Sequence, residues 1–291
     1  MYLDTSGEPL FKRGWREDKG DAPLKETLAA AMLVASGWAD LAQAKDPNAV
    51  VPPLYDPCCG SGTIAIEAAQ MLCGVAPGSL RHFAFEKMRP FNPGQWQAVR
   101  AAAQQKIHQH TGLVFGSDVA HRLVDFAQRN AERAGVADAV DFRGGDALQR
   151  MPPADKPGFI VLNPPYGERI AVAGIAGDSV AQSAGRDMSQ NAERHTPETV
   201  GRFGARELAQ VEDGGEFFGQ LARHWKHNYP GWTGWMLTPD LKLPGKMRMK
   251  ESRRVPMWNG PIECRMFRFD IKAFEPNLLP NPASKPAEAA P

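Results

Sequence analysis

The stretch Asp-Pro-Cys-Cys-Gly-Ser-Gly-Thr at residues 56–63 decides the fold. It follows a short apolar run that ends at Tyr55, and it opens a helical pattern of apolar residues that continues to Leu72. Strand, glycine turn and helix in this order are the plan of a doubly wound nucleotide-binding half. Gly60 and Gly62 let the backbone pass close to a ligand, where a side chain would block it. The helix N-terminus beyond them offers unpaired N–H groups.

A second stretch, Asn-Pro-Pro-Tyr at residues 163–166, follows another apolar run at residues 159–162. It is therefore expected at the carboxyl end of a strand, the edge where open parallel sheets bind their ligands. The tetrapeptide supplies a side-chain amide, two rigid prolines and an aromatic ring. These groups suit a planar molecule that carries an NH2.

Two acids follow further predicted strands between these stretches. Residues 113–118 read as a strand that ends in Asp118, and a carboxylate at the tip of the second strand can accept two hydrogen bonds from ribose hydroxyls. The alternative role for Asp118 is to cap the helix predicted at 119–134. A third strand at 140–143 precedes the Gly-Gly-Asp-Ala turn, which contains Asp146.

Helices are predicted at residues 23–38, with Gly37 at the end, and at residues 94–110. In the second of these, apolar residues such as Trp96 and Val99 recur at helical spacing, and we interpret them as core positions. Residues 255–258 and 262–269 read as a closing antiparallel pair around Asn-Gly.

Together, Asp-Pro-x-Cys-Gly-Ser-Gly-Thr and Asn-Pro-Pro-Tyr-Gly-Glu-Arg resemble the class I S-adenosylmethionine-dependent methyltransferases that modify exocyclic amines. Within them the sequence is most similar to the THUMP-associated RNA guanine-N2 methyltransferases, in particular the bacterial 23S ribosomal RNA enzymes. The likeness runs from about Tyr2 to Phe269, excluding an insertion. Further motifs that carry it lie at residues 3–10, 12–16, 22–27 and 259–264.

The resemblance implies a Rossmann-like α/β fold: a mixed seven-stranded sheet with helices on both faces and a terminal antiparallel strand pair. We expect an N-terminal linker or basic loop at residues 1–22 and the methyltransferase domain at 23–270. Residues 171–215 are poor in aromatic and periodic apolar residues and are predicted to be a mobile insertion. The proline- and alanine-rich residues 271–291 are predicted to be disordered.

The resemblance also implies S-adenosyl-L-methionine as the cofactor. Asp118 would bind the ribose hydroxyls and Asp146 the adenine amine. The full set of expected cofactor-binding residues is Asp56, Cys59, Gly60, Gly62, Thr63, Asp118, Asp146, Ala147 and Asn163.

Three residues of the second stretch are the candidate catalytic groups. The side-chain oxygen of Asn163 and the backbone carbonyl of Pro164 would accept hydrogen bonds from the two N–H groups of the target amine. Tyr166 would stack on the base, a contact worth about 1–3 kcal/mol. Positioning would then provide most of the catalysis, since well-oriented reactants gain roughly 7–11 kcal/mol.

Basic residues gather in two places that could contact RNA phosphates. The first is Lys12, Arg13 and Arg16, for which a solvated linker is the alternative. The second is the run from 242 to 254, for which a solvated hairpin tip is the alternative; the candidate contacts there are Lys246, Arg248 and Arg253, and Arg169 is a further one. The net charge of +1 counts mildly against a large electrostatic footprint.

Relatives of this kind usually carry a THUMP-type RNA-binding domain before this point, and the chain begins almost at the linker after it. We therefore expect a fragment, a misassigned start codon, or a separate domain or protein that captures the RNA. Either way the predicted partner is ribosomal RNA, with 23S RNA favoured.

Several classes of protein are disfavoured. Four cysteines and seven histidines form neither a disulfide framework nor a metal site, so we expect no metal. The sequence contains no apolar run of roughly 18 residues and no signal peptide pattern, so a cytoplasmic protein is expected. A nicotinamide dehydrogenase is weakly supported, because the glycine turn lacks GxGxxG spacing.

Other substrates and roles stay open. DNA adenine N6 and a protein glutamine amide are modified with the same tetrapeptide, although the flanking motifs favour ribosomal RNA. A non-catalytic RNA-associated module is also conceivable, but the intact Asn-Pro-Pro-Tyr speaks against it.

Overall fold

The structure, a computed structural model, describes residues 3–20, 23–44, 46, 49–164 and 215–272. The predicted site residues Tyr166 and Arg169 lie outside the described residues. So do most of the proposed insertion and nearly all of the proposed C-terminal tail.

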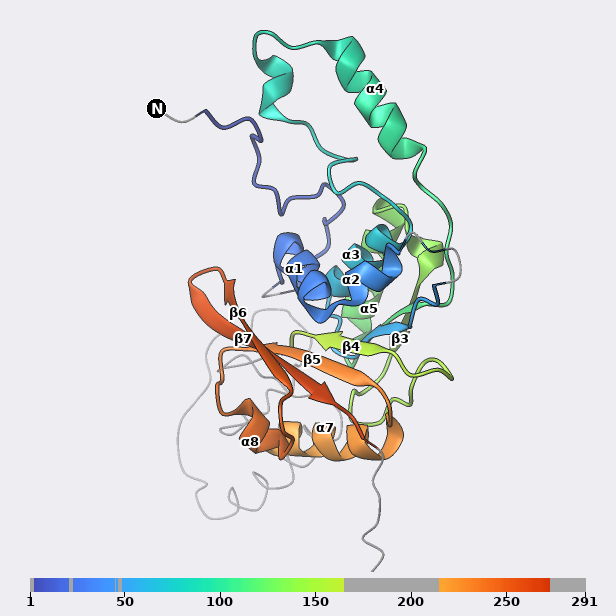
Figure 1. The fold of residues 1–291 in the computed structure, drawn as a ribbon, viewed down its shortest axis with the longest axis vertical. Helices are drawn as coiled ribbons and strands as arrows, with labels where there is room; N and C mark the ends of the chain where they lie inside the picture. The colour runs from blue at the N-terminus through green and yellow to red at the C-terminus, as the bar shows by residue number, and fades with distance from the viewer. Residues whose placement is uncertain (1–2, 21–22, 45, 47–48, 165–214, 273–291) are drawn as a thin grey trace, which may run out of the picture.

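A seven-stranded sheet with the order β3-β2-β1-β4-β5-β7-β6 forms the centre of the molecule (Figure 1). The pairs among β3, β2, β1, β4 and β5 are parallel, whereas β7 runs antiparallel to both β5 and β6. The predicted mixed sheet with a terminal antiparallel pair is therefore confirmed. The strands are β1 (Leu54–Asp56), β2 (Val114–Asp118), β3 (Val140–Gly144), β4 (Phe159–Leu162), β5 (Thr233–Thr238), β6 (Arg253–Asn259) and β7 (Ile262–Asp270).

Helices cover both faces of the sheet and bury two separate apolar cores (Figure 1). The first core lies beneath α1, α2, α3 and α5, and includes Trp38 and Ile66. The second lies beneath α7 and α8, and includes Trp225 and Phe267. The helices are α1 (Glu26–Ser36), α2 (Trp38–Ala42), α3 (Thr63–Leu72), α4 (Pro93–Gln104), α5 (His121–Arg133), α7 (Gly215–Asn228) and α8 (Leu243–Met247), with 3-10 turns η1 (Ala84–Lys87) and η2 (Ala137–Ala139).

The helix α4 corrects one prediction. It projects from the body of the molecule (Figure 1), and none of its residues is buried. Val99 keeps 57% of its surface exposed, so the interpretation of this helix as part of the core was wrong. Its Trp96 instead packs edge-on against Phe83 and Phe85, with ring centroids 5.7 and 5.0 Å apart. The helical periodicity is real, but the apolar side meets only a neighbouring loop.

The N-terminal segment is packed into the domain, which neither sequence-based alternative foresaw. Trp15 is fully buried. Arg13 forms a two-pronged ion pair with Glu67 of α3, with Nε and Nη2 at 3.1 and 3.2 Å from the carboxylate oxygens. Arg16 lies 3.1 Å from Glu26 of α1. The side chains of Arg13 and Arg16 are only 11% and 10% exposed. Both guanidinium groups therefore serve internal ion pairs, whereas the side chain of Lys12 is exposed. Contact of these three residues with RNA phosphates stays a prediction.

Two features are absent from the described residues. No helix there has the length and apolar character to cross a bilayer. Nor does that part of the chain bring three or more histidine, cysteine, aspartate or glutamate side chains together as metal ligands.

The pairing of Arg13 with Glu67 gives a stability prediction. Arg13→Ala should lower the free energy of unfolding by about 3 kcal/mol, because it leaves a buried carboxylate without its partner. The double variant Arg13→Met, Glu67→Met should regain most of this loss, since it removes both charges. Urea denaturation would measure both values.

The neighbouring Lys12 provides the control. Its ion pair with Glu8 is exposed, so Lys12→Ala should change the free energy of unfolding by less than about 0.5 kcal/mol. Equal losses for Lys12→Ala and Arg13→Ala would contradict the structural role of the buried pair.

Candidate active site

The candidate site is the edge of the sheet where β1, β2 and β4 end. β1 pairs in parallel with both neighbours, with Tyr55 opposite Phe115 on one side and Ile160 on the other. The carboxyl ends of all three strands therefore reach the same edge. The glycine turn after Asp56, the carboxylate of Asp118 and the amide of Asn163 leave the sheet there, as the sequence predicts.

The glycine turn is held against the end of β2 by hydrogen bonds. The N–H of Cys59 donates to the carbonyl of Ser117 at 2.9 Å, and the N–H of Gly60 donates to Oδ2 of Asp118 at 2.9 Å. Gly60 has a φ of 54°, and a Cβ on it would meet no atom of the described residues within 4 Å, so the space beside it is open on their side. This turn can admit a ligand close to its backbone.

Gly62 differs from Gly60 because the space beside it is filled by neighbouring side chains. Its φ is 88°, and an added Cβ would lie 2.9 Å from Cβ of Ala127 and 3.0 Å from Cζ of Phe142. The residue thus lets α3 start close against α5 and β3. Of the two glycines, Gly60 leaves room for a ligand and Gly62 for packing.

Asp118 is oriented by backbone donors. Its Oδ1 accepts from the N–H of Ala120 and its Oδ2 from that of Gly60, both at 2.9 Å. The helix α5 starts at His121 without a side-chain cap, so the alternative role of Asp118 as helix cap is not what the structure shows. Burial raises the pKa of the Asp118 carboxyl, and the two N–H donors oppose this shift.

Asp56 is the most deeply buried acid of the site, at 2% exposure. Its Oδ1 accepts from the N–H of Cys58 at 3.1 Å. Burial raises the pKa of this carboxyl to about 8, with the nearby charge of Asp118 contributing in the same direction. An acid held this far from its ordinary pKa, at a strand end with other polar groups, is typical of a functional site.

The loop after β3 lies beside the end of β2. The N–H of Gly145 donates to the carbonyl of Asp118 at 3.0 Å, so the two loops are joined. Asp146 accepts from the N–H of Leu148 at 2.9 Å, and Ala147 is buried. Asp146 and Ala147 therefore reach the same edge as Asp118, where the sequence predicts them.

Asn163 follows β4, and Pro164 beside it is buried. The Oδ1 atom of Asn163 is buried and has no hydrogen-bond donor within the described part of the chain. A buried acceptor without a donor costs roughly 1–3 kcal/mol, so such atoms often serve a ligand. Here the acceptor directly follows β4, which pairs with the strand that leads into the glycine turn.

The cysteines of the turn are unsuited to nucleophilic catalysis. Burial raises the pKa values of the Cys58 and Cys59 thiols well above their usual range, and the neighbouring carboxyls add to the effect. Thiols in such surroundings stay protonated and inert. Cys58 and Cys59 are therefore suited to packing and hydrogen bonding at this edge, and not to nucleophilic attack.

Sequence reasoning missed one residue that shapes the site, Gly116, and one contact, that of Arg16 with Thr63. Arg16 donates through Nη2 to Oγ1 of Thr63 at 2.7 Å, so it fixes the first residue of α3. Gly116 in β2 lets Phe142 approach, because a Cβ there would lie 2.6 Å from its ring. The isolated glycine within a strand pattern was a usable signal, whereas the partner of Arg16 was not readable from sequence.

The second group of predicted RNA-binding residues is divided between two elements of the fold, α8 and β6. The run from 242 to 254 forms α8 and the start of β6, and it is not a hairpin tip. Lys246 lies 3.2 Å from Asp240, and Arg248 follows α8 with its side chain exposed. Arg253 is exposed at the start of the edge strand β6. Binding of RNA by these residues stays a prediction.

The strand order, the glycine turn and the acids at successive strand ends define a class I methyltransferase fold. The chain belongs to the family described as RMKL-like, methyltransferase domain, which it matches over residues 13–198.

Two curated relatives are both named ribosomal RNA large subunit methyltransferase K/L. The protein from Psychromonas ingrahamii is 32% identical over 290 residues, which cover 98% of this chain and 32% of the relative. The protein from Shewanella baltica is 35% identical over 278 residues, which cover 94% and 32%. The chain thus spans about a third of the length of these relatives.

Solved structures give the same fold. A possible methylase from Clostridium difficile is 29% identical with a TM-score of 0.67, covering 94% of this chain and 58% of that one. A suspected methyltransferase complexed with SAH (S-adenosylhomocysteine) is 25% identical, with the same TM-score and coverage. A predicted N6-adenine-specific DNA methylase from Listeria monocytogenes is 26% identical, with a TM-score of 0.66 and coverage of 91% and 56%.

The raised pKa of Asp56 predicts how stability depends on pH. Between about pH 4 and pH 8 the folded protein keeps a proton on this carboxyl that the unfolded chain releases. Its contribution to stability is therefore lost as the pH rises through about 8. The free energy of unfolding should therefore fall with rising pH by at most about 1.4 kcal/mol per pH unit between these two values. Asp56→Asn should flatten this slope and should raise the free energy of unfolding at pH 8.

Denaturant unfolding at several pH values would measure the slope. Asp155→Asn, at an exposed carboxylate in a loop, is the matched control and should leave the slope as it is. Identical slopes for the parent protein and Asp56→Asn would show that Asp56 is ionised in the folded state.

Proposed function

We propose that the protein transfers a methyl group from S-adenosylmethionine to the exocyclic N2 amine of a guanine in RNA, with large-subunit ribosomal RNA as the substrate. The observation that carries this proposal is the buried Oδ1 of Asn163, which has no donor in the described part of the chain. Asn163 follows β4, which pairs with the strand that leads into the glycine turn, and its acceptor would receive an N–H from a planar NH2 group.

The residues at the edge of the sheet fit the proposed cofactor. The open space beside Gly60 leaves room for a ligand against the backbone. Asp118, held by two backbone donors, has acceptor positions left for ribose hydroxyls. Asp146 would accept from the adenine amine, with the backbone of Ala147 beside it. Asp56, Cys59 and Thr63 would form the rest of the cradle. When bound, the cofactor supplies an electrophilic methyl group on a sulfonium.

The proposed work of the protein is to hold and orient the amine. The lone pair of an exocyclic amine is delocalised into the ring, which makes the nitrogen a poor nucleophile. Asn163 Oδ1 and the carbonyl oxygen of Pro164 would each accept a hydrogen bond from one N–H group of the amine. These two hydrogen bonds would favour a tetrahedral nitrogen. Tyr166 is proposed to stack on the base, as for bases lifted out of a helix. No strong base is required, because the amine becomes acidic as the new bond forms.

The names of relatives support RNA as the substrate class. The curated relatives are named for ribosomal RNA of the large subunit. The Listeria protein is named for adenine in DNA, and adenine N6 is also an exocyclic amine. The same pair of acceptors would hold either amine, so an assay has to offer both nucleic acids.

The proposal predicts separate losses for two variants. Asn163→Ala should lower the rate of methyl transfer by about 100-fold, as for the loss of one preorganised polar group at a reacting centre. It should leave S-adenosylmethionine binding within about twofold. Asp118→Ala should instead weaken cofactor binding about tenfold, because it removes the hydrogen bonds that a carboxylate accepts.

Transfer of labelled methyl to ribosomal RNA and to DNA, with nucleoside mass spectrometry of the product, tests the reaction. Calorimetry measures cofactor binding for each variant. Formation of N2-methylguanosine by the parent protein supports the proposal, and methylated adenine in DNA would overturn it. Full turnover by Asn163→Ala would remove the proposed role of that amide.

A further inference from the structure

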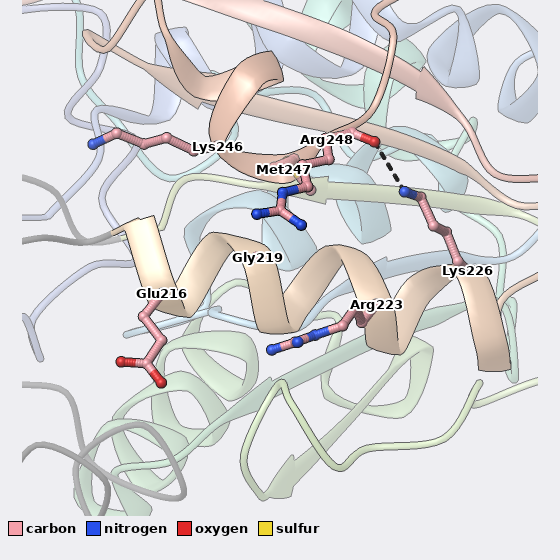
Figure 2. A pocket seen from close by; sticks show the side chains of 7 residues that line it. All are labelled: Glu216, Gly219, Arg223, Lys226, Lys246, Met247 and Arg248. Carbon is pink, nitrogen blue, oxygen red and sulfur yellow. Dashed lines mark hydrogen bonds between the residues drawn. The ribbon is translucent and has the colours of Figure 1, made fainter.

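A pocket of about 240 Å³ lies between α7 and α8 (Figure 2). These two helices cover the face of the sheet opposite α1 and α3 (Figure 1). Four of its seven lining residues are cationic. One side is closed by the buried side chain of Met247. The lining residues are Glu216, Gly219, Arg223, Lys226, Lys246, Met247 and Arg248.

The charges of this pocket are only partly neutralised by neighbours. Within the described part of the chain, no ion pair involves the guanidinium of Arg223 or of Arg248, and both residues are exposed. Lys246 is paired with Asp240 at 3.2 Å. The one acid, Glu216, accepts from Gln220 at 3.1 Å, and Figure 2 shows its carboxylate directed away from α8. The pocket is therefore suited to an anion.

The backbone at Arg248 gives an independent sign of function. Arg248 follows the last residue of α8 with a φ of 48°, and it is the only non-glycine residue with positive φ in the described part of the chain. Glycine is the usual residue at such a helix end, since it avoids the strain. Keeping an arginine in a strained conformation points to a use for its side chain. Lys226 fixes this backbone by donating to the carbonyl of Arg248 at 2.9 Å (Figure 2).

The course of α7 connects the pocket to the candidate active site. α7 joins β4 to β5, which are parallel, so its first turn lies near the edge where β4 ends at Asn163. The helix then runs back along the sheet. From Glu216 to Lys226 it rises about 15 Å. A chain that enters at Asn163 could thus follow α7 and meet the cations in succession.

We infer that the pocket between α7 and α8 binds backbone phosphates of the RNA whose base is held at Asn163. This inference rests on the proposed function and adds the path of the RNA strand next to the target nucleotide. The guanidinium of Arg248 lies over Gly219 between the two helices (Figure 2), and it is the central phosphate ligand. Arg223 and Lys226 extend the contact along α7. Arg253, which does not line this pocket, is not part of it.

The variant Arg248→Gly tests this assignment directly. It removes the guanidinium and relieves the backbone strain, so the melting temperature should stay equal or rise. RNA binding should nevertheless weaken about three- to fivefold, as expected when one exposed ion pair is removed. The slope of log Kd against log salt concentration should become shallower by about 0.7 for each phosphate of a single strand that the variant no longer neutralises. Fluorescence anisotropy with a labelled single-stranded RNA oligonucleotide, without cofactor, measures both quantities.

A second pair of variants uses Gly219. A Cβ there would meet only the carbonyl of Lys246 at 3.8 Å, so the position accepts a side chain without a clash. Gly219→Ala should bind RNA like the parent protein. Gly219→Glu places a carboxylate in the pocket and should weaken binding by more than Arg248→Gly does. Lys106→Ala, which removes an exposed charge beyond α4, is the control for charge alone and should bind normally.

Methyl transfer to ribosomal RNA provides the second readout. Arg248→Gly should raise KM for RNA and leave kcat unchanged, because the guanidinium that it removes would hold an RNA phosphate and would not touch the reacting atoms. Unchanged RNA affinity and salt dependence in both Arg248→Gly and Gly219→Glu would overturn the inference. So would saturable binding of inorganic phosphate to the pocket with RNA binding unaffected by either variant.

The two proposals can fail separately. If the parent protein methylates no RNA but loses RNA affinity in Arg248→Gly, the proposed function fails and the phosphate site stands. If it forms N2-methylguanosine and the pocket variants keep the parental KM, the phosphate site fails alone.

Discussion

The parallel pairing of β1 with β2 and β4 is the constraint on which the rest of the structure depends. β1 has only three residues, and all of them are buried. Its hydrogen bonds to both neighbours bring together strand ends that are about a hundred residues apart in sequence. A slip of one residue would turn Asp56 to the other face of the sheet and move the glycine turn away from Asp118. The candidate site is thus a product of strand register.

The distribution of buried charge separates the site from the scaffold. On the α1–α3 side, Glu26 and Glu67 each lie beside an arginine, so their charge is balanced inside the protein. At the edge of the sheet, Asp56 and Asp118 are desolvated, and within the described part of the chain they accept hydrogen bonds only from backbone N–H groups. The acids that are paired with an arginine, Glu26 and Glu67, stabilise the position of the N-terminal segment. Acids without a cationic partner among the described residues mark the place where a ligand's hydroxyl, amine or positive charge can be received.

Sequence alone predicted the sheet and the candidate site, because glycine turns and polar strand ends are local signals. It failed where the answer depends on a distant partner. The apolar spacing in α4 predicted a helix with one apolar side, but it could not predict which part of the chain packs against that side. The run of cations around Arg13 gave no sign that Glu67, 54 residues away, would neutralise one of them. The cations of α7 could not be joined to Arg248, since only the packing of α7 against α8 brings them together.

The projection that carries α4 begins and ends at neighbouring points of the chain's path. The N–H of His108 donates to the carbonyl of Cys73 at 3.0 Å, so the chain leaves the sheet and returns to it at neighbouring points. Further out, the projection is hydrogen-bonded to the N-terminal segment, where the N–H of Phe85 donates to the carbonyl of Thr5 at 3.1 Å. Because the bond between His108 and Cys73 and the pairing of β1 with β2 already fix both ends, lengthening the excursion adds only a small closure entropy, about 0.6 kcal/mol for each doubling. Relatives could therefore vary the length of this projection without changing the strand pairing at the candidate site, which makes it a natural place for evolution to change what the protein contacts.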